Sequence, residues 1–141
     1  MKSKLKHLLL LIAPLLVATG CNFTTNSLLP GQRLLNFEIL LDDQIQFTGF
    51  LGVNDHLPVP QMWNVLPEVT FEPVEKESIL NDPRQATVSY KGNVLIRMKH
   101  VDEELDSIAT ENLTLSRSAT TNAWSLNPKD IERLQSQLQQ R

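Results

Sequence analysis

Few residues in this sequence have the types and spacing that metal chemistry requires. Met98 and His100 are separated by one residue, and a thioether sulfur with an imidazole nitrogen suits copper(I). His56 and Met62 are further soft ligands elsewhere in the chain. The plainer interpretation places Met98 and His100 on one face of a strand, where they serve the fold. We therefore predict no metal site and no cofactor.

Carboxylates gather in the segment 102–106, and Glu111 follows closely. Carboxylate oxygens are ligands for calcium, but the segment lacks the glycine and the alternate spacing of a calcium loop. A solvated acidic loop is the simpler interpretation. The chain also has no Gly-x-Ser-x-Gly elbow, no glycine-rich phosphate loop and no His-Glu-x-x-His motif. We predict no catalytic residue and a protein that is not an enzyme.

Three aromatic side chains, Trp63, Tyr90 and Trp124, are the candidates for lining a pocket in a curved sheet. Such a pocket would favour an apolar or aromatic ligand. In a domain of this size, however, tryptophan is more often part of the core.

The N-terminal residues have the composition of an export signal. Three lysines occur in the first six residues, and an apolar run follows at residues 8–17. Ten helical residues rise about 15 Å, half of what a bilayer core requires, so the run is too short to span a membrane. A basic start, a short apolar centre and small residues before Cys21 are typical of a secretory signal peptide.

The segment Val17-Ala18-Thr19-Gly20-Cys21 resembles the lipobox of bacterial lipoproteins. This resemblance implies cleavage between Gly20 and Cys21 and acylation of Cys21, for example with palmitate. It also implies a protein anchored in the cell envelope by its acyl chains. Asn22 follows the cysteine where Asp would signal inner-membrane retention, which favours the outer membrane, facing the periplasm, if the organism has one. The alternative is an ordinary signal peptide that leaves Cys21 as a free thiol, although the chain offers no second cysteine as a disulfide partner.

The domain organisation follows from this cleavage. Residues 1–20 are the signal, 21–33 are the acylated cysteine with a flexible tether, and 34–141 form a single globular domain. Loss of the leader removes three lysines and leaves ten basic residues against sixteen acidic ones, a formal charge of −6. An acidic protein does not suit nucleic acid, which is bound through basic residues. The predicted partners are the membrane and another envelope protein.

Alternating apolar and polar residues predict an antiparallel, mainly β structure. We expect one hairpin over 35–48, in which Leu35, Phe37 and Ile39 share one face, Asn36 and Glu38 lie on the other, and Leu40 is the exception to the alternation. A helical turn is expected at 61–66 and a strand at 69–74. A second hairpin is expected over 86–98 with its turn at Lys91-Gly92-Asn93, and a third over 113–126. A helix should begin at Pro128 behind the cap Asn127 and fray from Gln135 onward.

The predicted fold class is therefore α+β with about six or seven strands and one C-terminal helix. The strands would form a curved sheet, a small sandwich or a barrel. The last expected hairpin, Leu113-Thr114-Leu115 to Trp124-Ser125-Leu126, is loosely similar to that of NTF2-like cone folds.

Two functions remain open. The first is a non-enzymatic binding or assembly module, with the apolar stripe Ile131, Leu134 and Leu138 either as a partner face or as core. The second is an NTF2-like protein that binds a small ligand, with weak acid–base chemistry from residues such as Asp55 or His56.

Overall fold

The described part of the chain comprises residues 28–75 and 86–141 of a computed structural model. Contacts between residues separate a compact unit, Gly31–Arg141, from the unit Met1–Pro30. The predicted signal peptide, the cleavage site at Gly20-Cys21 and the tether up to residue 27 lie outside the described residues. Among the described residues, no helix combines the length and the apolar character needed to cross a bilayer.

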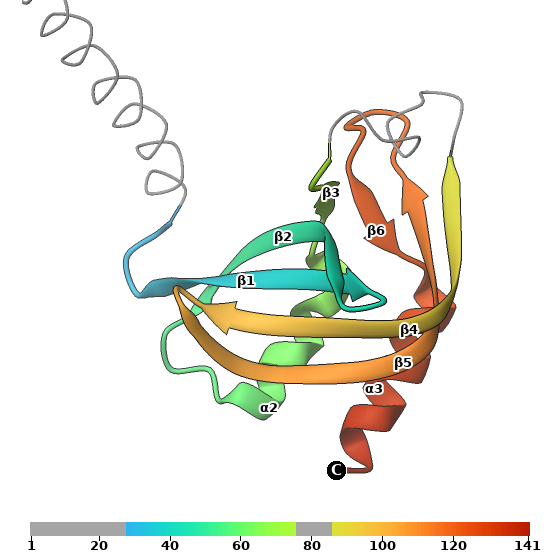
Figure 1. Cartoon of the computed structure of the whole chain (residues 1–141). Coiled ribbons are helices and arrows are strands. Elements are labelled where there is room, and N and C mark those ends of the chain that lie inside the picture. Colours follow the sequence, from blue (N-terminus) through green and yellow to red (C-terminus); the bar gives the residue numbers. More distant parts are fainter. Residues whose placement is uncertain (1–27, 76–85) are drawn as a thin grey trace, which may run out of the picture. The chain divides into compact units, whose positions relative to one another are not determined.

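Six strands make up a closed barrel (Figure 1). They are β1 (Gln32–Leu41), β2 (Gln44–Asn54), β3 (Phe71–Pro73), β4 (Thr87–His100), β5 (Glu103–Arg117) and β6 (Trp124–Leu126). Their order around the barrel is β1-β2-β3-β6-β5-β4, and every neighbouring pair is antiparallel. The predicted α+β class with mainly antiparallel strands is confirmed, and of the architectures considered the barrel is the one formed.

The first hairpin, β1 with β2, follows the sequence pattern closely. Leu35, Phe37 and Ile39 are fully buried, as their alternation predicted. Asp42 and Asp43 both have positive φ, which is the geometry of a tight two-residue turn whose twist matches the strands. The register shifts between Ile39 and Leu40 because β2 has one extra residue there, Gln46, which forms a bulge. Leu40 itself stays at an outward position of β1, where it is only 7% exposed.

The interior of the barrel is filled by large apolar side chains. The largest fully buried ones are Trp124, Phe37, Phe47, Phe71, Leu35, Ile39, Met62, Leu66, Ile96, Met98, Leu113 and Leu115. Aromatic rings meet edge to face in two places: Phe37 with Trp63, at 6.2 Å between centroids, and Phe47 with Trp124, at 6.3 Å. Such pairs add to the stability that burial provides.

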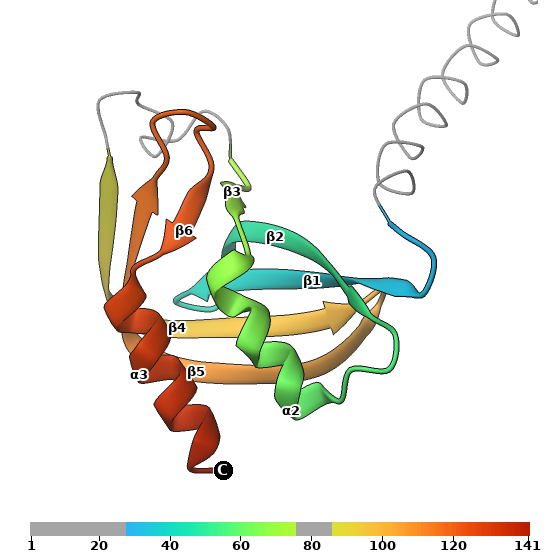
Figure 2. The ribbon, with the colours of Figure 1, turned by 180° about the vertical axis from the view of Figure 1, so that it is seen from behind.

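Helical segments lie together on one side of the barrel (Figure 2). They are α2 (Val59–Met62), the 3₁₀ helix η1 (Trp63–Glu68) and α3 (Pro128–Gln139). The helical turn predicted at 61–66 is confirmed, with Trp63 and Leu66 buried. The predicted start of α3 is also confirmed, because the Asn127 side chain accepts a hydrogen bond from the backbone N–H of Lys129 at 2.9 Å.

Two of the local predictions are wrong. The residues Lys91-Gly92-Asn93 do not form a turn, because β4 continues through them and pairs with β5 on both sides of a bulge. The actual turn between these strands lies at Val101-Asp102, so Glu103–Asp106 belong to β5 and not to an acidic loop.

Smaller differences concern the two ends of the domain. Gln32 and Arg33, expected in the tether, are the first residues of β1. The helix α3 does not fray from Gln135, but continues to Gln139. The reason is that the Arg141 guanidinium forms hydrogen bonds with the Asp106 carboxylate at 2.9 Å and thereby holds the C-terminus against β5.

Candidate functional site

The three aromatic residues considered for a pocket pack in the core of the protein or against it. Trp63 and Trp124 are buried in the core, and Tyr90 packs against that core from β4. The Trp63 indole N–H donates to Asp106 at 2.8 Å, and the Arg117 guanidinium lies 5.5 Å from the Trp124 ring centroid. The structure places the two tryptophans in the fold itself, as the core interpretation predicted.

The apolar stripe of α3 faces the protein's own interior. Leu134 is completely buried, Ile131 is 8% exposed, and Leu138 packs partly buried against the same core. The stripe is therefore core, and Ile131 and Leu134 are not accessible to a partner. Leu138 does reach the surface in a cleft of about 230 Å³ between η1 and α3. This cleft is lined by Pro60, Trp63, Asn64, Gln135, Leu138 and Gln139.

The soft metal ligands are dispersed. Met98 is buried in the barrel, His100 ends β4, and His56 lies in the exposed turn after β2. The Met62 sulfur is also buried, where it accepts a hydrogen bond from Arg33 at 3.5 Å. Within residues 28–75 and 86–141, no three His, Cys, Asp or Glu side chains lie close enough together to hold a metal ion.

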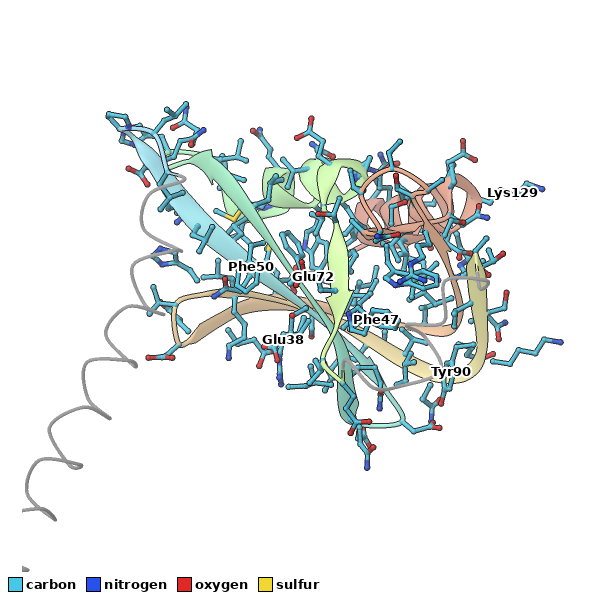
Figure 3. All side chains as sticks on the ribbon, turned by 90° about the horizontal axis from the view of Figure 1, so that it is seen from above. Glu38, Phe47, Phe50, Glu72, Tyr90 and Lys129 are labelled. Atoms are coloured by element: carbon cyan, nitrogen blue, oxygen red, sulfur yellow. The ribbon has the colours of Figure 1, made fainter. Side chains whose placement is uncertain are left out.

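The most distinctive polar cluster lies on the outer face of β1, β2 and β4. Glu38 points outward from β1, yet it is only 9% exposed and is the one buried charged residue in the described part of the chain. Its carboxylate forms ion pairs with Arg97 at 3.0 Å and with Lys99 at 3.4 Å. Figure 3 labels Glu38 together with Phe50 of β2 and Glu72 of β3.

The register of the strands explains why these residues meet. Glu38 lies opposite Thr48 on one side and Arg97 on the other. Two residues earlier on the same face, Asn36 lies opposite Phe50 and Lys99. Since alternate residues of a strand share a face, the two rows form one patch across three strands.

This patch encloses a shallow groove of about 250 Å³, which we call the outer groove. It is lined by Asn36, Phe37, Glu38, Thr48, Gly49, Phe50 and Lys99. Phe50 forms an apolar wall and is 53% exposed. The side-chain oxygen of Asn36 is buried and has no hydrogen-bond partner among the described residues, and the same holds for Nε of Arg97.

The electrostatics of the outer groove favour binding over catalysis. Burial alone would raise the pKa of Glu38, but the hydrogen bond and charge of Arg97, together with Lys99, outweigh it and hold that pKa below its usual value. A carboxylate kept ionised in this way is a poor proton acceptor at neutral pH. The groove-lining residues also provide no nucleophile paired with a base.

The patch has the chemistry that a peptide segment would match. Peptide groups carry an acceptor for the remaining protons of Lys99, and an apolar side chain fits against Phe50. The sequence assigned Asn36 and Glu38 to the outer face, but it did not show that Phe50 and Lys99 flank them. Only the pairing of β1 with both β2 and β4 brings these residues together.

Comparisons of the chain with protein-family models, with curated proteins and with solved structures found no match.

Proposed function

We propose that this protein is a lipoprotein of the cell envelope, anchored through acyl chains on Cys21, that works as a non-enzymatic binding or assembly module. The observation that carries the proposal is the sequence Val17-Ala18-Thr19-Gly20-Cys21 behind a basic and apolar leader. Two acyl chains hold a protein on a membrane where a single chain gives only reversible binding. The predicted location is the periplasmic face of the outer membrane, if the organism has one.

The binding role is supported by the outer groove. It combines an exposed aromatic side chain, Phe50, with a lysine, Lys99, that is held in place by its ion pair with Glu38. Exposed aromatic residues beside fixed polar groups are common anchors in protein interfaces. We propose that a segment of another envelope protein docks in this groove.

A small-ligand function of the NTF2-like type has less support. The inward positions of the strands hold large apolar side chains, which fill the space that an internal ligand would need. Asp55 and His56, considered for weak acid–base chemistry, lie exposed in the turn after β2, away from an enclosed site.

Anchoring is tested by labelling cells that express the full chain with a clickable palmitate analogue. Wild-type protein should take up the label and sediment with membranes, whereas Cys21→Ala should lose the label. Ser27→Ala, which lies outside the lipobox, is the matched control and should behave as wild type. An unlabelled wild-type protein would contradict the proposal.

Binding through the outer groove is tested by placing a photo-crosslinking amino acid at position 50 in cells. The control position is Lys129, which is exposed at the start of α3. A single abundant adduct at 50, absent at 129 and reduced in the Cys21→Ala protein, is the expected result. Equal adducts at both positions, or none at 50, would remove the outer groove as the docking surface.

A further inference from the structure

The strand β4 is paired on both sides along only half of its length. Its C-terminal half, Val94–Lys99, lies between β1 and β5. Its N-terminal half, Thr87–Lys91, pairs with β5 alone, and no strand in the described ranges 28–75 and 86–141 lies on its other side. In Figures 1 and 2 this half is the yellow strand at the side of the barrel, with orange β5 beside it. We call Thr87–Lys91 the open edge.

The hydrogen bonds around β5 show which backbone groups point outward from the open edge. The N–H of Arg117 donates to the carbonyl of Ala86 at 2.8 Å, so this opposed pair is hydrogen-bonded. Hydrogen-bonded and non-hydrogen-bonded pairs alternate along an antiparallel ladder. It follows that Val88 and Tyr90 use their backbone groups on β5, whereas Thr87, Ser89 and Lys91 direct theirs away from it.

The contacts of Thr114 confirm this assignment independently. Thr114 lies opposite Ser89, but its N–H donates to the Asp130 carboxylate at 2.7 Å, and its carbonyl accepts from the N–H of Asn127 at 3.0 Å. Both backbone groups of Thr114 therefore face away from β4. The N–H and C=O of Ser89 correspondingly face the open edge.

The open edge exists because β1 ends too early to cover it. The N–H of Asp42, in the turn after β1, donates to the Asn93 carbonyl at 3.0 Å, and β1 continues no further along β4. Beyond this point Val88 and Tyr90 pack only partly buried against the core. An unpaired strand with half-covered apolar side chains is a template for another strand.

We infer that the open edge pairs with the same edge of a second copy of this chain, antiparallel and with Ser89 on the two-fold axis. In this register Thr87 lies opposite Lys91 of the other copy, and Ser89 lies opposite Ser89. Every outward N–H and C=O of these three residues then gains a partner, because the free groups are arranged symmetrically about Ser89. A shift of two residues in either direction leaves some of them unpaired.

The side chains of the open edge suit this register. The small Ser89 side chains meet at the axis, where larger ones would crowd. Lys91 is the only charged residue of the open edge, and it faces Thr87 of the other copy, so like charges are not opposed. A second copy therefore satisfies the backbone groups of the open edge without opposing like charges.

A five-residue pairing is small beside the roughly 1,200–2,000 Å² of a standard interface. The dimer is therefore expected where copies are concentrated, as on one membrane surface. In this respect alone the inference rests on the proposed lipid anchor, since tethering raises the effective concentration of the copies.

Cysteine crosslinking of the full chain in cell membranes tests both the dimer and its register. A hydrogen-bonded antiparallel pair places the two Cα atoms about 5.5 Å apart, within disulfide range. Ser89→Cys should form a covalent dimer on mild oxidation. Thr87→Cys alone should crosslink at least tenfold less, because its two copies lie roughly 13 Å apart along the strands. Mixing Thr87→Cys with Lys91→Cys chains should restore the crosslink.

Ser89→Pro provides the loss-of-pairing variant. The proline removes an N–H that does not bond to β5, so the variant should keep the melting temperature of the wild-type chain. When Ser89→Pro is added to the Thr87→Cys and Lys91→Cys chains, the crosslink between them should be lost. If Ser89→Pro fails to fold, the single-cysteine comparison decides alone.

Equal crosslinking by Ser89→Cys and Thr87→Cys would overturn the register, and no dimer with Ser89→Cys would overturn the inference. Crosslinking of Ser89→Cys to a different protein in place of itself would overturn it as well. The palmitate label on the same samples separates the two proposals. A labelled chain that forms no dimer refutes only the pairing. In an unlabelled chain a free Cys21 would crosslink the Ser89→Cys and Thr87→Cys forms alike, so an unlabelled chain that dimerises with Ser89→Cys but not with Thr87→Cys refutes only the anchor.

Discussion

The carboxylate of Asp106 joins three parts of the protein, and its removal gives the sharpest test of how the helical side is held to the barrel. It accepts hydrogen bonds from the indole N–H of Trp63 at 2.8 Å and from the guanidinium of Arg141 at 2.9 Å. Trp63 is 2% exposed, whereas the Arg141 side chain is 46% exposed. Water can therefore replace the hydrogen bond of Asp106 with Arg141, but not the one with the buried Trp63.

The expected loss of stability follows from this difference. In Asp106→Ala the buried indole N–H of Trp63 has no acceptor, which costs about 1–3 kcal/mol. Loss of the exposed ion pair with Arg141 adds only about 0.2–1 kcal/mol. Asp106→Asn keeps an oxygen that can accept from Trp63, so it should cost less than Asp106→Ala. Arg141→Gln removes the exposed pair with Asp106 and the hydrogen bond from Arg141 to the Ser107 carbonyl, and at this exposed position it should cost about 1 kcal/mol.

A double-mutant cycle measured by urea unfolding at neutral pH tests this partition. In a Trp63→Phe background the indole donor is gone, so Asp106→Ala should then cost only the part due to Arg141 and the nearby backbone. If Asp106→Ala costs the same in both backgrounds, the hydrogen bond to Trp63 does not hold the helical side, and the reasoning is refuted.

The same carboxylate predicts a pH dependence. Burial alone would raise the pKa of Asp106, but hydrogen bonds from Trp63, Ser107 and Arg141 outweigh it and lower that pKa below its usual value of 3.8. A pKa that is lower in the folded state stabilises the protein above the pKa of the unfolded state, and this stabilisation is lost as the pH falls through the folded value. The difference between wild type and Asp106→Asn should therefore shrink on acidification below about pH 4.

Three further predictions concern the core and the outer groove. Leu134→Ala should lower the free energy of unfolding, measured with urea, by about 2–5 kcal/mol because Leu134 is fully buried. Leu138→Ala, the matched control at a half-buried position, should lower it clearly less. Equal losses would contradict the assignment of this stripe to the core. Gly49→Ala should destabilise the protein by about 1–3 kcal/mol, because a Cβ there would lie 2.7 Å from the backbone oxygen of Thr70. An unchanged melting temperature would contradict the close approach of β2 to the segment before β3. Glu38→Gln should lower the free energy of unfolding by about 1–3 kcal/mol at neutral pH, because Arg97 and Lys99 lose their counter-charge. Since the pKa of Glu38 is lowered in the fold, the difference in stability between wild type and Glu38→Gln should fade as the pH falls below about 4. A difference that persists below that pH would show that the charge is not its cause.

Local sequence patterns were sufficient to predict those strands and helices whose signals lie within a few consecutive residues. Alternation from Leu35 to Ile39 placed the first hairpin, and Asn127-Pro128 placed the start of α3. The burial of α3 could not be settled in this way, because an apolar stripe looks the same whether it faces the core or a partner. Its contact with η1 and β5 depends on residues far apart in the chain.

The outer groove escaped prediction for a similar reason. The alternation showed that Asn36 and Glu38 point outward, but a strand pattern does not say which strands flank it. Closure of the barrel places β4 beside β1, although residues 42–86 separate the two strands in the chain, and thereby brings Arg97 and Lys99 to Glu38. Long-range register is the information that a single sequence does not contain.

The wrongly predicted hairpin in β4 and the open edge have the same origin. A glycine between two alternating runs is the usual signal of a tight turn, and Gly92 does have a positive φ of 149°. Had the chain turned there, Thr87–Lys91 would have paired with Val94–Met98. Each run would then have supplied hydrogen-bond partners for backbone groups of the other. Instead β5 is long enough to pair with both runs, so Gly92 accommodates a bulge within one continuous strand. The run after Gly92 gains β1 as its second neighbour, and the run before it gains none among the described strands.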